Sequence, residues 1–93
     1  MNDPAVSICD VTARSTARVV GRVVAIRVEA KDSAPQFGAV VDDGTGRIDA
    51  IFMGRRTVPG IEPGAFIAIE GTVCEAQALP RMFNPRYELQ TPA

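Results

Sequence analysis

The sequence contains no histidine and no tryptophan. Without an imidazole, the chain cannot build a Ser–His triad, a histidine general base or a histidine-containing metal site. A serine or threonine with no base beside it is not an activated nucleophile. We therefore predict a protein that is not an enzyme and has no catalytic residues, no metal site and no cofactor.

Cysteine is almost as scarce. The chain has two, Cys9 and Cys74, which are far apart in sequence and belong to no Cys-x-x-Cys pair. A structural zinc site needs several ligands at close spacing, and this spacing does not supply them. We expect both cysteines to be small buried hydrophobic residues.

An excess of charge and long apolar runs are also missing. The chain has 10 basic and 11 acidic residues, for a net charge of −1. Strong nonspecific binding to duplexes comes mainly from neutralising phosphates, so this balance argues against it but allows a local basic patch. No apolar run approaches the roughly 20 residues that span a bilayer. Residues 1–4 show neither the basic nor the apolar region of a signal peptide. We expect a cytoplasmic protein without membrane contact.

The chain does contain a strong β-strand pattern. Its 93 residues suffice for one domain. Alternating apolar residues, many of them β-branched, predict strands over residues 17–30, 36–42, 47–53, 65–75 and 81–89. Gly21 and Gly71 predict bends, and Asn84-Pro85 interrupts the last strand. We expect residues 1–16 to form an arm that packs on a barrel of residues 17–90.

Period-2 alternation also assigns side chains to the two faces of these strands. Inward-facing residues are predicted at Phe37, Ala39, Val41, Ile48, Ala50 and Phe52, and outward-facing ones at Val40, Arg47, Asp49, Ile51 and Met53. The expected core includes Val23, Ile48, Phe52, Ile67 and Ile69. Residues 54–64 carry two prolines and three glycines, so we expect a connection with at most one helical turn.

Two adjacent carboxylates, Asp42 and Asp43, precede Gly44 between the second and third predicted strands. Paired carboxylates can hold a metal or act in acid–base chemistry. Their position in a hairpin turn explains them better, because Asp side chains bond to turn backbone.

The chain resembles the OB-fold. The pattern Val19-x-Gly21-x-Val23, Asp43-Gly44-Thr45-Gly46, Pro63-Gly64 and Ile69-Glu70-Gly71-x-Val73 is similar to the nucleic-acid-binding OB domains attached to tRNA synthetases. Asn84-Pro85-Arg86-Tyr87-Glu88 is similar to the close of the wedge domain in the RecG branch-migration helicase and to small stand-alone bacterial OB proteins. The resemblance covers roughly residues 17–89. It implies an all-β, five-stranded OB-fold Greek-key barrel.

One segment departs from the RecG wedge. In that wedge, aromatic residues after the third strand stack on bases at a DNA fork. Here the segment is Phe52-Met53-Gly54-Arg55-Arg56, with Phe52 expected in the core and arginines where aromatic residues should follow. The chain also has no Walker-type GxxxxGK motif, so it does not drive ATP hydrolysis itself.

OB domains bind single strands by combining a positive groove with stacking platforms on the outer faces of the second and third strands. Candidate nucleic-acid-binding residues are Arg18, Arg22, Lys31, Arg47, Ile51, Met53, Arg55, Arg56 and Arg86. The alternative for the arginines is a set of ordinary solvated charges, each near an acid such as Asp49 or Glu70. The outward apolar residues Val40, Ile51, Met53 and Phe66 fit either base stacking or contact with another protein or a second copy.

Two classes of function fit these residues. The first is a non-enzymatic nucleic-acid-binding module that prefers single-stranded DNA or RNA, or DNA junctions. The second is a protein-interaction or oligomerisation module that uses the same outer face. An accessory subunit working with a separate motor or nuclease is a third reading. Strand binding through arginine weakens steeply with added salt, whereas apolar association does not, so the salt response separates the first two classes.

Overall fold

The computed structural model describes residues 5–31, 34–74 and 79–91, and the side chain of Lys31 lies outside this description. Strands dominate the described residues, and the one helical element among them is the short 3₁₀ helix η1 (Ile8–Asp10). The strands are β1 (Thr16–Lys31), β2 (Ala34–Asp42), β3 (Arg47–Met53), β4 (Phe66–Cys74), β5 (Arg81–Phe83) and β6 (Arg86–Gln90). The predicted all-β class is confirmed. Among the described residues, no helix has the length and apolar character to cross a bilayer.

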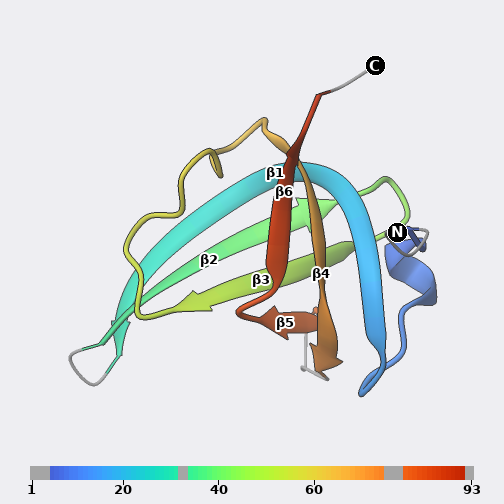
Figure 1. Cartoon of the computed structure of the whole chain (residues 1–93), viewed down its shortest axis with the longest axis horizontal. Helices are drawn as coiled ribbons and strands as arrows, with labels where there is room; N and C mark the ends of the chain where they lie inside the picture. The colour runs from blue at the N-terminus through green and yellow to red at the C-terminus, as the bar shows by residue number, and fades with distance from the viewer. Residues whose placement is uncertain (1–4, 32–33, 75–78, 92–93) are drawn as a thin grey trace.

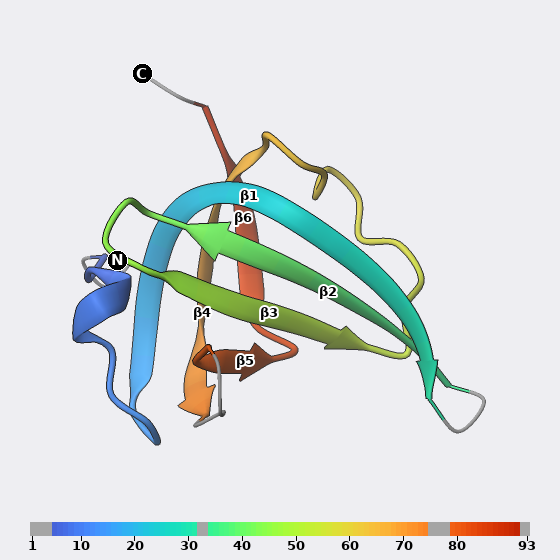
Figure 2. The same ribbon diagram turned by 180° about the vertical axis from the view of Figure 1, so that it is seen from behind.

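The strands close into a barrel because β1 belongs to both of its sides. Residues 22–31 of β1 pair with β2, and residues 16–22 pair with β4. The ring then runs from β2 to antiparallel β3, to parallel β5, and through β5 back to β4. Figures 1 and 2 show the arch of β1 over the other strands from opposite sides. This order is the OB-fold Greek key, as predicted.

The predicted fifth strand consists of two short strands. β5 pairs with β3 and β4, whereas β6 pairs with β4 over residues 86–90. The break falls at the expected Asn84-Pro85, where Asn84 adopts a left-handed φ of 50°. Proline cannot donate to a ladder, so the chain turns here and changes partner.

Gly21 lies where β1 turns from one side of the barrel to the other. A Cβ at this position would lie 2.6 Å from the backbone oxygen of Asp42 and 2.9 Å from Cγ1 of Val41. A larger residue therefore does not fit without a shift of β2. Just after this point the register with β2 slips between Val23 and Ala25, which is a β-bulge. The bulge shifts the inward–outward alternation of β1 by one residue. Even-numbered residues such as Arg22 face out before it, and odd-numbered residues such as Arg27 face out after it.

The barrel interior is filled by alternating apolar residues from every strand. Val23, Ile48, Ile67 and Ile69 are all 0% exposed and Phe52 is 5% exposed, so the predicted core is confirmed. The ring of Phe52 meets that of Tyr87 edge-on with centroids 5.7 Å apart. Val58 and Ile61 of the irregular 54–64 segment add to the same core.

The N-terminal segment packs over one end of the barrel through η1. Ile8 is 3% exposed and belongs to the core cluster. Its backbone N–H donates to Oδ2 of Asp43 at 2.8 Å, and the N–H of Cys9 donates to the Thr45 hydroxyl at 3.2 Å. Cys9 itself is exposed and Cys74 is half-buried, so the expectation that both are buried is wrong. Cys9 is exposed because its neighbour Ile8 is the residue that packs into the end of the barrel.

The hairpin turn uses its carboxylates as predicted. Asp42 accepts from the N–H of Gly44 at 2.7 Å, and Asp43 accepts from the N–H of Thr45 at 2.8 Å. Burial by itself would raise the pKa of Asp43, but hydrogen bonds from Thr45, Ile8 and Gly46 outweigh it and lower the pKa. Within the described residues, no group of three or more Cys, Asp or Glu side chains is arranged to hold a metal.

Candidate functional site

The outer face of β1, β2, β3 and β5 carries a continuous set of side chains. Directly opposed residues in neighbouring strands point to the same side of a sheet. One row across this face therefore consists of Arg27, Gly38, Ile51 and Phe83, and the next of Glu29, Gln36 and Met53. A third row contains Ala25, Val40, Asp49 and Arg81. The inner-face residues Phe37 of β2, Ala50 of β3 and Met82 of β5 belong to the core cluster, so this face points away from it.

The centre of this face is hollowed into a groove of about 380 Å³. Its lining consists of Arg27, Glu29, Gln36, Asp49, Ile51, Leu79 and Arg81. Leu79 lies between β4 and β5 in the sequence, and it is the one lining residue that belongs to no strand. In OB barrels, the connection between the fourth and fifth strands borders the binding face. We name this site the β2–β3–β5 groove.

Arg27 spans the floor of the groove. Its Nη2 donates to Oδ2 of Asp49 at 2.5 Å, and its Nε donates to Oε1 of Glu29 at 3.3 Å. The Asp49 hydrogen bond is the main reason that the pKa of Arg27 is raised. A Cβ on Gly38 would lie 3.1 Å from Nη2 of Arg27, so the guanidinium lies directly over this glycine.

Ile51 faces the groove, but it is 1% exposed, so the prediction that it forms exposed outer surface is wrong. The strand alternation is correct, because Ile51 is absent from the core cluster that contains its neighbours Ala50 and Phe52. Strand alternation predicts the face on which a side chain lies, but it does not predict whether other residues bury that face. Here the outer side is itself covered: Asp49, on the same face, is also buried at 5% exposure.

The exposed apolar surface lies beside Ile51. Phe83 is 46% exposed and Met53 is 48% exposed, and both lie on the outer face at the β3–β5 end of the groove. Asn84 fixes this corner: its N–H donates to the Ile51 carbonyl at 2.6 Å, and its side-chain Oδ1 accepts from the N–H of Met53 at 2.9 Å. Met53 therefore lies on the outer face, as predicted, and it shares that face with Phe83.

Arg55 and Arg56 follow this corner and are exposed. Arg55 and Arg86 line a second cleft, of about 490 Å³, together with Phe52, Asn84, Pro85 and Tyr87. Phe52 is a core residue, so no exposed aromatic follows β3 in the place that the RecG wedge would require. The second cleft adjoins the Met53–Phe83 corner through Asn84 and adds positive charge there.

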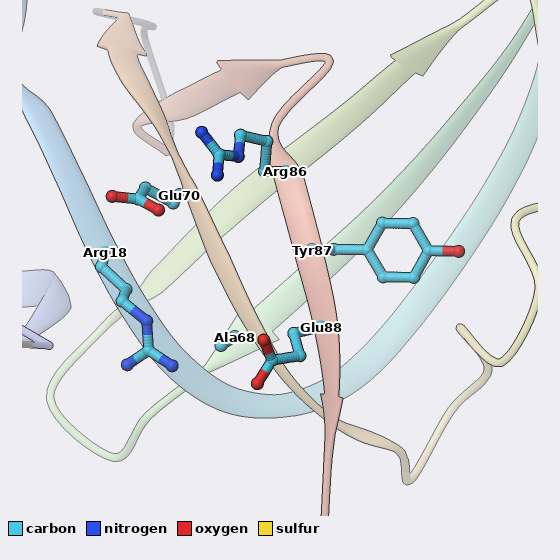
Figure 3. Close-up of a pocket in the computed structure, with 6 residues that line it drawn as sticks. All are labelled: Arg18, Ala68, Glu70, Arg86, Tyr87 and Glu88. Carbon is cyan, nitrogen blue, oxygen red and sulfur yellow. The ribbon is translucent and has the colours of Figure 1, made fainter. Parts of the chain in front are cut away.

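Arg18 and Arg22 lie on a different face, and Arg86 lines a pocket there as well as the second cleft. Arg18 lies opposite Glu70, and Glu70 opposite Arg86, on the outer side of β1, β4 and β6. A small pocket of about 150 Å³ is lined by Arg18, Ala68, Glu70, Arg86, Tyr87 and Glu88 (Figure 3). Two positive and two negative side chains alternate there. Arg22 lies over the Phe66 ring, 4.8 Å from its centroid. This surface is mixed in charge.

Two predicted residues lie at the ends of strands. Arg47 starts β3, and its Nε is 3.0 Å from Oδ2 of Asp42 across the hairpin. Lys31 is the last residue of β1, not part of the loop in which the sequence placed it, because β1 pairs with β2 up to Ala34. Its side chain lies outside the described residues. The candidate arginines are thus divided among the groove corner, the mixed-charge face and the hairpin end.

Sequence reasoning missed six side chains of the groove and its edge: Arg27, Glu29, Gln36, Leu79, Arg81 and Phe83. Arg27 was missed because the bulge after Val23 shifts the phase of β1. Arg81 and Phe83 are two residues apart in the predicted strand 81–89, so strand alternation already placed both side chains on one face of the sheet. Their parallel pairing with Asp49 and Ile51 of β3 places them at the groove.

No protein-family model and no curated protein matches the sequence. The fold does have a solved counterpart, the solution NMR structure of a replication factor A related protein from Methanobacterium thermoautotrophicum, with a TM-score of 0.73. The match covers 94% of this chain and 91% of that chain at 16% sequence identity. Likeness at this identity concerns the fold alone, and it agrees with the OB-fold barrel. It does not bear on the narrower resemblance to the RecG wedge.

Proposed function

We propose that this chain binds single-stranded nucleic acid along the β2–β3–β5 groove and catalyses no reaction. Proteins that hold single strands without sequence preference combine a positive groove along the backbone with apolar or aromatic side chains on which bases stack. This face offers arginine side chains and exposed apolar side chains together, although two carboxylates balance the two arginines within the groove itself. Arg27 and Arg81 line the groove, and Phe83 and Met53 are exposed at its corner.

The observation that carries the proposal is the exposure of Phe83. A phenylalanine that is 46% exposed on a strand loses hydrophobic stabilisation that burial would provide. Its outward position beside a groove gives it a flat surface that a base can cover. Arg55 and Arg56, exposed just beyond this corner, are suited to hold the phosphates of a strand that leaves it.

The fold supports the same class of ligand by analogy only. The structural counterpart is called a replication factor A related protein. DNA junctions, the ligand that the resemblance of residues 84–88 to the RecG wedge implies, are a narrower form of the proposal. Binding to a fork would use the second cleft, with Arg55 and Arg86, in addition to the groove.

A protein-interaction or oligomerisation module remains the second candidate, and one observation favours it. The four charged residues of the groove balance: Arg27 and Arg81 against Glu29 and Asp49. A balanced groove with exposed Met53 and Phe83 beside it also suits an apolar protein contact.

Fluorescence anisotropy against labelled single-stranded DNA, single-stranded RNA and duplex, at low and high salt, separates the two candidates. We expect single strands to bind, with affinity that falls as salt rises. The double change Arg55→Ala/Arg56→Ala should weaken binding and reduce the slope of log K against log salt by roughly 0.7 per lost phosphate contact. Arg81→Ala removes a donor from the groove and should also weaken binding.

The matched control is the double change Arg18→Ala/Arg22→Ala, which removes two arginines from the mixed-charge face. It should alter binding less than the Arg55/Arg56 pair does. Self-association that survives high salt, with no strand binding at either salt concentration, would contradict the proposal and favour the protein interface.

A further inference from the structure

Asp49 is the only buried charged side chain in the described part of the chain. It lies on β3 and lines the β2–β3–β5 groove. Oδ2 accepts from Nη2 of Arg27, whereas Oδ1 is buried and has no hydrogen-bond donor among the described residues. A buried carboxylate oxygen without a donor carries an uncompensated desolvation cost, so its presence calls for an explanation.

A donor-rich side chain lies next to Asp49 but does not pair with it. Arg81 is directly opposite Asp49 in the parallel β3–β5 register and lines the same groove. The ion pairs among the described residues are Arg27–Glu29, Arg27–Asp49 and Arg47–Asp42, so Arg81 takes part in none of them. The groove thus holds a hydrogen-bond acceptor, Asp49 Oδ1, beside the donors of the Arg81 guanidinium. Neither has a partner among the described residues.

We propose, on the basis of the proposed single-strand binding, that Asp49 Oδ1 accepts a hydrogen bond from the exocyclic amine of a cytosine or an adenine, so that the groove prefers these bases over uracil and thymine. Carboxylates of Asp and Glu accept from the N4 amine of cytosine. The ring nitrogen beside the amine, N3 of cytosine or N1 of adenine, is an acceptor, and Arg81 is placed to donate to it. Single-stranded bases are commonly bound through this Watson–Crick edge.

Uracil and thymine do not match the same pair of side chains. Their C4 substituent is a carbonyl, so it would present an oxygen to the carboxylate oxygen of Asp49. Two acceptors face each other in that arrangement, and the desolvated Oδ1 would remain without a donor. The preference therefore depends on one functional group of the base.

A base reaches Oδ1 only after a side chain at the groove floor moves. Arg27 is placed to make that movement: its side chain is 39% exposed and its guanidinium lies over Gly38. Its charged end is held in place by Asp49 and Glu29 alone among the described side chains.

The test compares oligo(dC) with oligo(dU) of equal length, about 12 nucleotides, which is within the ~4–16 that one OB barrel covers. The two bases differ only in the amine or carbonyl at C4 and in the proton at N3. By anisotropy at neutral pH, we expect the wild type to bind oligo(dC) about 10-fold more tightly, the lower range for a hydrogen bond to a charged group. Asp49→Asn should bring the ratio to within about twofold, because its amide can turn its N–H₂ toward the uracil carbonyl.

Glu70→Gln is the matched control. It neutralises a carboxylate on the mixed-charge face, outside the β2–β3–β5 groove. It should leave the cytosine preference intact. Should Asp49→Asn fail to fold, Arg81→Ala removes the donor to the ring nitrogen and should lower the preference for oligo(dC), and an unchanged ratio would overturn the inference.

The outcomes separate this inference from the proposed function. Tight and equal binding of oligo(dC) and oligo(dU) by the wild type overturns the inference and leaves single-strand binding intact. A cytosine preference that persists in folded Asp49→Asn overturns the role of Asp49. A failure of every single strand to bind refutes the proposed function, and the inference with it.

Discussion

Replacing Phe83 with alanine tests stacking with little disturbance of the barrel. The ring is 46% exposed, and the backbone of Phe83 stays paired with Ile51 whatever its side chain. Complete burial of a phenylalanine contributes about 1.5–3 kcal/mol, so the loss of a half-buried ring should cost about 1 kcal/mol. Domains of this size have about 5–10 kcal/mol of stability, so the variant should remain folded.

The effect on binding should be larger than the effect on stability. Stacking of a base on an aromatic ring contributes about 1–3 kcal/mol by alanine substitution, which is roughly a 5- to 150-fold rise in Kd. The assay is anisotropy with labelled single-stranded DNA, run beside a thermal melt. Phe83→Leu keeps apolar area but removes the flat ring, so it should lose most of the same affinity.

Leu89→Ala serves as the control for a generic exposed hydrophobic residue. Leu89 is 53% exposed on β6, which pairs with β4 and lies outside the β2–β3–β5 groove. Its removal should leave Kd within about twofold of the wild type. A folded Phe83→Ala variant that also binds within twofold of the wild type refutes the stacking argument.

Three further predictions concern stability. Phe52→Ala should cost about 3–5 kcal/mol, because Phe52 is 5% exposed and packs against Phe37 and Tyr87; a melting temperature within a few degrees of wild type would disprove its core role. Gly21→Ala should cost about 1–3 kcal/mol, since its Cβ would lie 2.6 Å from the Asp42 oxygen, and denaturant unfolding measures this. The pKa of Asp43 is lowered below its ordinary 3.8 in the fold, so its stabilisation is complete above that pH and declines as pH falls below it. Asp43→Asn should therefore flatten the loss of stability with falling pH, and an unchanged slope would contradict this.

The sequence predicted the fold well because the relevant information is local. Alternating β-branched residues set the strands, and Asp43-Gly44 set the hairpin. Asn84-Pro85 correctly marked the break between β5 and β6, since the missing N–H of proline is a local property. Phe52 and Ile48 were assigned to the core by parity alone, and both are buried.

The candidate site was harder to predict because it depends on contacts between distant segments. Ile51 was placed on the correct side of β3, but the other residues on its face leave it 1% exposed. One extra residue at the bulge after Val23 turned Arg27 toward the groove. Gly21 predicted a bend in this part of β1, but nothing in the sequence gave the position of the extra residue. Arg18 was grouped with Met53, although the closed barrel separates the β1–β4–β6 face from the β2–β3–β5 groove.

The most direct test of the account is an NMR titration of the ¹⁵N-labelled chain with unlabelled single-stranded DNA. The account predicts that amide shifts concentrate on the groove and its corner, at Arg27, Met53, Arg81 and Phe83, and spare the mixed-charge face around Arg18 and Glu70. Shifts centred on the β1–β4–β6 face, or no shifts at saturating DNA, would contradict it.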